Sequence, residues 1–335
     1  MLKIGLIGAG RIGKVHAHSV MTSIPNATLV GVADYDKDEA VNLAEQYQIP
    51  FATGNHRDIL DINEVDAVII ASSTDTHAPF TVQAAQAGKH IFCEKPIAAE
   101  LDKIDEALQA VAAAGVKFQV GFNKRFDASF YRIKQAIDTG EIGEPQLLHI
   151  ISRDPSPPPI SYIKVSGGLF FDMTIHDFDM AHFLFGAVDE IYAAGGVMVD
   201  PAIGAAGDID TAMITLKFTN GAIGAIDNSR QAVYGYDQRV EAFGSKGQAR
   251  NDNLYPDAVT LSTGENVKRG SLPMNFFLER YTPAYVSELE AFVNCVINDE
   301  PVPVSSADGR VPVVMAMAAK KSYDENRPVK LSEVS

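Results

Sequence analysis

The feature that most constrains the fold is a glycine-rich segment that directly follows an apolar stretch. Residues 2–7 have the composition of a strand buried in a parallel sheet, and Gly8-Ala9-Gly10-Arg11-Ile12-Gly13 follows at once. A second apolar stretch, residues 28–33, ends at Asp34, at about the 20-residue distance typical of a dinucleotide-binding unit. Strand, G-x-G-x-x-G, helix, strand and acidic residue in this order predict a Rossmann domain.

Each glycine of this segment has a physical task in such a unit. Gly8 makes the tight turn, Gly10 lets the backbone approach a pyrophosphate, and Gly13 lets helix and strand pack closely. The helix that follows offers free N–H groups and its positive dipole end to the phosphates, so Arg11 and Ile12 join the predicted cofactor-binding residues. The alternative is a glycine-rich turn without a ligand.

Asp34 predicts which dinucleotide is bound. A carboxylate at this position accepts hydrogen bonds from the ribose hydroxyls of NAD and repels the 2′-phosphate of NADP. Lys37 is the only cation nearby, and no arginine follows Asp34. The sequence therefore favours NAD.

The alternation of helix and strand continues to residue 121. Helices are expected at residues 37–47, 78–87 and 101–114, and strands at residues 65–71, 90–93 and 117–121. Ligands of such sheets bind beyond the carboxyl ends of the strands. This edge adds six residues to the predicted cofactor site: Ser72, Thr74, His77, Glu94, Lys95 and Asn123. The histidines at positions 16, 18, 56 and 90 lie off this edge or on helices and are expected to be structural or solvated.

Lys95 is a cation at the carboxyl end of an apolar strand, followed by Pro96. An ammonium group there could hold the oxygen of a reacting alcohol as negative charge develops on it. The alternative is a salt bridge with Glu94. Position alone leaves both interpretations open.

A second segment with candidate catalytic residues is 167–180, in which two glycines precede an apolar helix. Asp172 and His176 are four residues apart and would share one helix face, with Asp179 three residues further on. A carboxylate and an imidazole on an apolar helix can form a proton-transfer pair. The alternative is that Asp172 caps the helix and His176 is a core histidine.

Beyond residue 121 the pattern changes from alternating helices and strands to strands in series. An amphipathic helix is expected at 130–139, strands at 145–152, 188–199, 211–218, 222–229, 238–243 and 258–262, and late helices at 283–298 and 308–324. Serial strands predict a largely antiparallel open sheet with helices on one face. We therefore expect two domains, an NAD-binding Rossmann domain at 1–121 and an α+β domain at 122–335 that binds the substrate and mediates oligomerisation.

Composition excludes several other classes of protein. The net charge of −15 argues against a nucleic-acid or anionic membrane surface, and no apolar run reaches the ~20 residues of a membrane span. The N-terminal segment lacks the layout of a signal peptide. Two cysteines without a paired motif fit a reducing cytoplasm. No metal site is predicted, because His176 and His182 are not at ligand spacing.

Three motifs together resemble one known family. The G-x-G-x-x-G loop, the tripeptide Glu94-Lys95-Pro96 and the segment Gly168…Asp172-x-x-x-His176-Asp177 are similar to those of the glucose–fructose oxidoreductase / inositol dehydrogenase (Gfo/Idh/MocA) family, and the resemblance covers nearly the whole chain. Residues 229–239 are most similar to bacterial inositol 2-dehydrogenases. The resemblance implies NAD-dependent oxidation of a cyclitol hydroxyl in inositol catabolism, with Lys95, Asp172 and His176 as catalytic residues. It also implies a homotetramer assembled through the C-terminal sheet.

The resemblance and the sequence together give a set of expected substrate contacts. These are Lys95, Asn123, Arg153, Asp154, Asp172, His176 and Tyr236. The loop at residues 153–159 varies among relatives, so myo- and scyllo-inositol both stay open as substrates. Other relatives oxidise aldoses or other sugars, and some have become non-catalytic sugar sensors. The presence of Lys95, Asp172 and His176 together argues against a sensor, which needs no base.

Overall fold

The computed structural model describes all 335 residues, which form two compact units. The first unit comprises residues 1–126 and 283–313, and the second comprises residues 127–282 and 314–335. The division differs from a single cut after residue 121, because the chain returns to the first unit near its C-terminus. Each unit is built around one sheet.

A six-stranded sheet in which every pair is parallel forms the centre of the first unit, with strand order β3-β2-β1-β4-β5-β6. Its elements are β1 (Leu2–Ile7), α1 (Arg11–Ser23), β2 (Ala27–Ala33), α2 (Lys37–Tyr47), β3 (Ala52–Thr53), α3 (His56–Leu60), β4 (Ala67–Ile70), α4 (Thr74–Gln86), β5 (His90–Glu94), α5 (Leu101–Ala114), β6 (Phe118–Gly121) and the 3₁₀ helix η1 (Asn123–Phe126). The strand order reverses between β1 and β4. This reversal is the switch point at which doubly wound sheets bind ligands.

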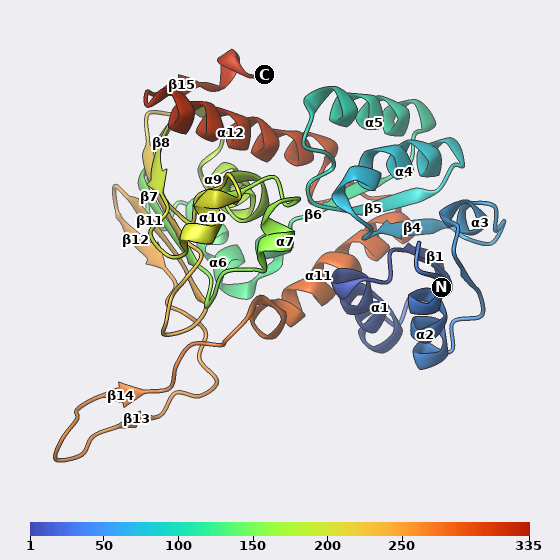
Figure 1. Cartoon of the computed structure of the whole chain (residues 1–335), viewed down its shortest axis with the longest axis horizontal. Helices are drawn as coiled ribbons and strands as arrows, with labels where there is room; N and C mark the ends of the chain where they lie inside the picture. Colours follow the sequence, from blue (N-terminus) through green and yellow to red (C-terminus); the bar gives the residue numbers. More distant parts are fainter. The chain divides into compact units, whose positions relative to one another are not determined.

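Helices cover both faces of this sheet. Helices α4 and α5 lie on one side, and α1 lies on the other with the C-terminal part of α11 (Phe277–Asn298) (Figure 1). Leu289, Phe292 and Val293 of α11 belong to the same buried cluster as the strand residues Ile4 and Ile69. Apolar residues on both faces explain why the strands consist almost entirely of buried side chains.

The second unit is built on a seven-stranded sheet with strand order β12-β11-β7-β10-β9-β8-β15. Its elements are α6 (Ala128–Asp138), β7 (Pro145–Arg153), α7 (Ile160–Ile163), α8 (Leu169–Asp172), α9 (Ile175–Phe185), β8 (Val188–Gly196), α10 (Pro201–Ala205), β9 (Thr211–Phe218), β10 (Ile223–Ser229), β11 (Asp237–Gly244), β12 (Gly247–Arg250), β13 (Thr260–Leu261), β14 (Arg269–Gly270), the C-terminal part of α12 (Ser306–Glu325), β15 (Val329–Lys330) and η2 (Leu331–Glu333). All neighbours are antiparallel except β7 and β10, so the sheet is mixed.

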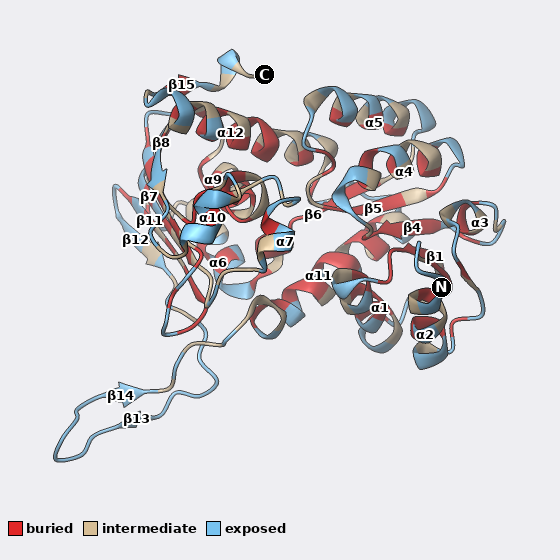
Figure 2. Ribbon diagram, in the orientation of Figure 1, coloured by how far each residue is buried: buried red, intermediate tan, exposed pale blue.

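The two faces of this sheet differ in burial. On β7, Leu148, Ile150 and Ser152 are buried on the face that carries helices, whereas Leu147 and His149 on the other face are exposed. The hairpin of β13 and β14 is exposed along its length (Figure 2). No helix of the chain has the length and apolar character needed to cross a bilayer.

The main local difference from the prediction lies in residues 169–180, where one continuous helix is expected after the two glycines. The structure has two helices, α8 and α9, separated by Met173 and Thr174. The Thr174 N–H donates to the carbonyl of Leu169, and its hydroxyl donates to Asn228 Oδ1 at 2.6 Å. This contact with β10 offsets the second helix from the first.

Candidate functional site

The glycine-rich loop lies between β1 and α1, and two of its glycines are required by packing. Gly8 has φ +108°, and a Cβ there would lie 2.5 Å from the backbone of Ala71 on the neighbouring strand segment. A Cβ on Gly13 would lie 1.9 Å from the carbonyl oxygen of Gly8. Any side chain at either position would push helix, loop and strand apart.

Gly10 is different, because nothing in the protein requires it. Its φ of −70° is open to any residue, and a Cβ would meet no atom within 4 Å. The space beside Gly10 therefore fits a ligand that approaches the backbone. Helix α1 begins at Arg11 with no capping side chain and no acidic residue in its first turn, so its N-terminal N–H groups are available to an anion. These observations fit the pyrophosphate of a dinucleotide.

Asp34 follows β2 at the same edge and is fixed by two backbone donors. Its Oδ2 accepts the Ala9 N–H at 2.6 Å, and its Oδ1 accepts the Asp36 N–H at 2.9 Å. The first bond ties the carboxylate to the glycine-rich loop itself. Each carboxylate oxygen can accept a second hydrogen bond, so Asp34 can still bind ribose hydroxyls.

The loop after β4 is connected to the loop after β5 by His77. This buried imidazole contacts the carbonyl oxygens of Pro96 at 2.8 Å and Ser72 at 3.1 Å, and burial lowers its pKa. Both ring nitrogens are thus engaged by backbone. His77 ties the two loops together, whereas the predicted neighbours Ser72 and Thr74 are at least partly accessible at the start of α4.

In the tripeptide Glu94-Lys95-Pro96, at the end of β5, Glu94 lies in the interior and Lys95 lies at the sheet edge. The Glu94 carboxylate is buried and contacts His16, so it is a structural group of the interior rather than an accessible cofactor ligand. Lys95 is half-buried at the carboxyl end of the strand, and the bond between Lys95 and Pro96 is cis. Asn123, also predicted at this edge, is buried at the start of η1.

In the second unit, Asp172 is the last residue of α8 and does not cap a helix start. Its carboxylate accepts from the Tyr162 hydroxyl at 2.8 Å and from Arg230 Nη1 at 3.2 Å. Arg230 is only 1% exposed and also pairs with Asp208 at 3.3 Å. Asp208 in turn accepts the first N–H of α8, from Leu169 at 3.0 Å. Two carboxylates and one buried guanidinium therefore clamp both ends of this short helix.

His176 lies in the first turn of α9 and is half-buried. Its neighbour Asp177 is buried and accepts from Asn228 Nδ2 at 2.8 Å, while Asn228 Oδ1 accepts from Thr174. Asn228 of β10 therefore fixes the start of α9 from both sides of Ile175. This network determines where the imidazole of His176 is presented.

Two further predicted substrate contacts are Asp154 and Tyr236. Tyr236 packs edge-on against Tyr281, with ring centroids 6.0 Å apart and planes at 87°. Burial raises the pKa of Tyr281 far above its ordinary value, and the negative charges of Asp177 and Asp154 act in the same direction. Asp154 follows β7 with the parity of its buried residues Ile150 and Ser152, on the helix side of the sheet.

The prediction that Arg153 contacts the substrate is not supported by its position in the sheet. It alternates with Leu148 and Ile150 along β7 and therefore lies on the uncovered face of the sheet. There its guanidinium pairs with Asp227 and donates to the Tyr234 hydroxyl at 3.0 Å. These contacts make Arg153 part of a surface ion-pair network and not of the site around His176.

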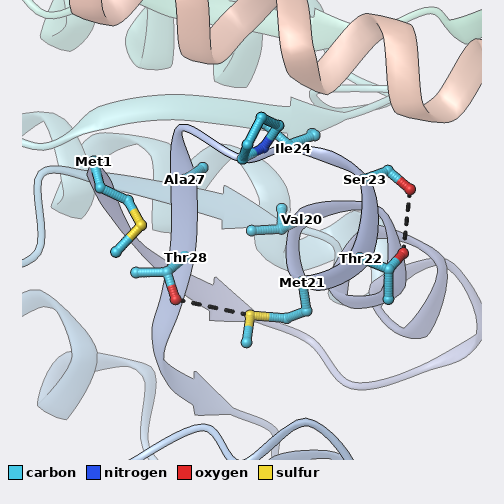
Figure 3. Close-up of a pocket in the computed structure, with 9 residues that line it drawn as sticks. Met1, Val20, Met21, Thr22, Ser23, Ile24, Ala27 and Thr28 are labelled. Atoms are coloured by element: carbon cyan, nitrogen blue, oxygen red, sulfur yellow. Dashed lines mark hydrogen bonds between the residues drawn. The ribbon is translucent and has the colours of Figure 1, made fainter.

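A surface hollow of the first unit has no connection with this chemistry. It is lined by Met1, the end of α1 and the start of β2, and it lies at the amino ends of the strands (Figure 3). The Met21 sulfur accepts from the Thr28 hydroxyl at 3.9 Å and from the Leu29 N–H at 3.3 Å. Cofactors of doubly wound sheets bind at the opposite edge.

Sequence reasoning misses the residues that hold the site in place, namely Tyr162, Asp208, Asn228 and Arg230. They come from α7, the loop before β9, β10 and the residue that follows it. Tyr162 and Arg230 contact Asp172, Asn228 contacts Asp177, and Asp208 pairs with Arg230, all only in the folded unit. The one available signal is the position of Arg230, a charged residue at the end of an apolar strand pattern.

Comparison with protein families gives two matches that together span most of the chain. Residues 2–122 match a family described as "Oxidoreductase family, NAD-binding Rossmann fold". Residues 130–250 match the GFO/IDH/MocA C-terminal domain. The first match covers the glycine-rich loop and Lys95, and the second covers Asp172, His176 and Arg230.

Individual relatives match the chain from end to end. A protein of Thermotoga maritima named myo-inositol 2-dehydrogenase is 47% identical over 334 residues, which cover 99% of each chain. The crystal structure of a probable dehydrogenase from Thermotoga maritima has a TM-score of 0.97 at 46% identity and covers 100% of both chains. The structure of scyllo-inositol dehydrogenase from Lactobacillus casei with bound NAD(H) and scyllo-inositol has a TM-score of 0.93 at 31% identity and covers 99% of each chain.

Proposed function

Because the chain belongs to the GFO/IDH/MocA family of NAD-binding oxidoreductases, we propose that it is an inositol 2-dehydrogenase, which oxidises one ring hydroxyl of myo- or scyllo-inositol to a ketone. The observation that carries the proposal is the anchored start of α9. There His176 follows Asp172 and is presented by a network that the second unit supplies by itself.

The residues of the first unit fit NAD. Backbone N–H groups at the start of α1 would hold the pyrophosphate beside Gly10, and the Asp34 carboxylate would accept from the adenosine ribose. When bound, NAD supplies the acceptor for the hydride that leaves the substrate carbon. Lys95, at the end of β5, is the cationic side chain on this edge that the proposal assigns to the substrate oxygen.

His176 is the proposed general base. Its imidazole takes the proton of the hydroxyl that is oxidised, a general-base role that histidine fills more often than any other side chain. The ammonium group of Lys95 stabilises the oxygen as the proton leaves. Asp172 is the third proposed catalytic residue. Tyr162 and Arg230 fix its carboxylate, which orients the imidazole or binds a second substrate hydroxyl.

Substrate recognition is assigned to further polar side chains of the two units. Asp154 and Tyr236 are retained as proposed contacts for the remaining hydroxyls, because Asp154 follows β7 with the parity of its helix-side residues and Tyr236 packs against the buried Tyr281. Asn123 is retained from the first unit as a contact for cofactor or substrate. Arg153 is omitted, because its guanidinium is occupied on the other face.

We also propose an oligomeric state, a cellular location and a metabolic role for the enzyme. The uncovered face of the seven-stranded sheet carries exposed apolar side chains at Leu147, Met213, Ile223 and Phe243, which supports assembly into a homotetramer through this face. Both cysteines are buried free thiols, which supports a cytoplasmic location. An inositol dehydrogenase in the cytoplasm would serve inositol catabolism.

The test is the reduction of NAD by the purified protein with a panel of polyols and sugars, followed by the absorbance of NADH. We expect turnover with myo- or scyllo-inositol and much less with glucose and other aldoses. Preferred turnover of an aldose would support the alternative sugar dehydrogenase. Binding of inositol without any turnover, in either direction of the reaction, would support the non-catalytic alternative.

A further inference from the structure

The first unit contains a buried cluster of three ionisable side chains that the proposed mechanism does not use. His16 comes from α1, Glu94 from β5 and Glu288 from α11, and one side-chain atom of each lies within 4.8 Å of the others. His16 and Glu288 are completely buried, and Glu94 is 8% exposed. Two carboxylates so close together in the interior require an explanation, because burial disfavours the charged form of both.

Each carboxylate oxygen of Glu94 has one partner, and Glu94 is adjacent to the proposed catalytic lysine. Its Oε1 is 2.7 Å from His16 Nε2, and its Oε2 accepts the backbone N–H of Lys95 at 3.3 Å. The carboxylate also packs against Gly121 of β6, where a Cβ would lie 3.1 Å from it. The orientation of Glu94 therefore bears directly on the backbone at Lys95.

Glu288 is the unsatisfied member. Neither of its carboxylate oxygens has a hydrogen-bond partner in the protein, although its backbone carbonyl accepts from Gln119 Nε2 at 2.9 Å. An ionised carboxylate in such a place would be both desolvated and close to the negative charge of Glu94. Burial, and then the charge of Glu94, raises the pKa of Glu288 well above its ordinary value.

The distances in this cluster indicate that a proton, and not a divalent cation, neutralises the negative charge of one of the two carboxylates. Two ligand atoms bound to one tetrahedral zinc ion lie roughly 3.3 Å apart, given metal–ligand bonds of about 2.0 Å. The 2.7 Å between His16 Nε2 and Glu94 Oε1 is a direct hydrogen bond instead. A protonated Glu288 needs no cation, since its carboxyl is neutral and can donate toward Glu94 through one water.

We propose that Glu288 is held as a neutral carboxylic acid in the folded enzyme and that, together with His16, it keeps the Glu94 carboxylate in the orientation that positions Lys95. Glu288 is thus a positioning residue that acts through Glu94. The statement about Lys95 rests on the proposed function, whereas the protonation of Glu288 does not.

The protonation predicts a specific pH dependence of stability. Groups that face Glu288 from the packed elements are His16 on α1, Glu94 on β5 and the uncharged Gln119 on β6. With its pKa raised in the fold, Glu288 contributes stability that is fully present below its unfolded pKa of about 4.3 and is lost as the pH rises toward the folded pKa. Glu288→Gln has no such titration, and its amide is always neutral.

The first experiment compares melting temperatures of the wild type, Glu288→Gln and the control Glu290→Gln from about pH 5 to about pH 8. Glu290 lies on the same helix but is exposed. We expect the melting temperature of Glu288→Gln relative to the wild type to rise steadily with pH, and that of Glu290→Gln to stay constant. A constant difference for Glu288→Gln would overturn the protonation. A stoichiometric bound divalent metal, detected by elemental analysis of the purified enzyme, would overturn it too.

The second experiment measures turnover, with Glu288→Met as the variant that cannot hydrogen-bond. Glu288→Gln should keep kcat within about threefold of the wild type, and Glu288→Met should lower kcat by about tenfold or more with little change in the KM for NAD, a split expected of lost positioning. Equal kcat values for the two variants would overturn the positioning role. An inactive wild type would instead refute the proposed function and leave the melting experiment informative.

Discussion

The carboxylate of Asp34 accepts N–H groups from Ala9 and Asp36, so it is oriented before any cofactor binds. Its charge is therefore fixed where the 2′ position of a ribose is expected. Asp34→Ser should reduce the preference for NAD over NADP, measured as the ratio of their kcat/KM values, by about tenfold or more, which corresponds to at least ~1.4 kcal/mol. The control Glu45→Gln removes an exposed carboxylate from α2 and should leave the ratio unchanged. Equal use of both cofactors by the wild type would contradict this assignment.

His176 and His182 lie on the same helix and provide a matched pair for testing the base. His176→Ala should lower kcat by about 10²–10⁴, the contribution typical of a general base, with unchanged NAD affinity and melting temperature. The imidazole of His182 is hydrogen-bonded to the carbonyl of Gly186 at 3.3 Å, and His182→Ala should keep turnover near the wild-type value. A large loss of stability in His176→Ala with high residual activity would identify His176 as a core residue.

At the level of elements, the glycine-rich loop separates glycines needed for folding from the one that leaves room for a ligand. A Cβ at Gly13 would overlap the Gly8 carbonyl at 1.9 Å, whereas a Cβ at Gly10 would meet nothing. Gly13→Ala should therefore lower the melting temperature by several degrees. Gly10→Ala should fold with wild-type stability but bind NAD more weakly, by about tenfold, as shown by calorimetric titration. Wild-type NAD affinity in Gly10→Ala would show that the pyrophosphate is held elsewhere.

The local elements of the first unit could be predicted because their signals are local. The expected helix at 37–47 agrees with α2, and the strand at 90–93 agrees with β5 to within one residue. The single helix expected after the two glycines is wrong, because it is interrupted at Met173 and Thr174. There the Thr174 N–H donates to the carbonyl of Leu169, five residues earlier, and its hydroxyl donates to Asn228 on a distant strand. A hydrophobic pattern read along the chain contains no information about such a partner.

The same reason limits what could be predicted of the candidate site. Asp172 and His176 are recognisable because they are close in sequence and match a family motif, but Arg230 and Asp208 join them only through the order of strands in the second sheet. Arg153 illustrates the opposite error. It is near a variable loop in sequence, yet the period-two alternation of β7 carries its side chain to the uncovered face.

For the whole molecule, the division of the chain depends on two late helices. Residues 283–313, which include most of α11 and the start of α12, belong to the first unit, although they follow the strands of the second in sequence. Their apolar faces predict burial but not against which sheet. The Leu289, Phe292 and Val293 cluster under the parallel sheet is consequently a feature that only the structure reveals.

The uncovered face of the second sheet makes a prediction about assembly. Met213 and Phe243 are 50% and 40% exposed on β9 and β11, and a stable oligomer would bury them. The wild type should have the mass of a tetramer in light scattering after size exclusion, and Met213→Asp with Phe243→Asp should dissociate it into smaller species. The control Val267→Asp replaces an exposed apolar residue near β14 and should not change the mass. A monomeric wild type would contradict the proposal.

The central proposal is that Lys95 and His176 both act on the inositol hydroxyl that is oxidised. A double-mutant cycle on kcat with Lys95→Met and His176→Ala tests it most directly, since residues that act on one reacting atom have strongly non-additive effects. We predict that each single variant loses about 10² or more in kcat and that the double variant loses far less than the product of the two factors. Independent, multiplicative losses, or a single variant with nearly wild-type turnover, would contradict the account.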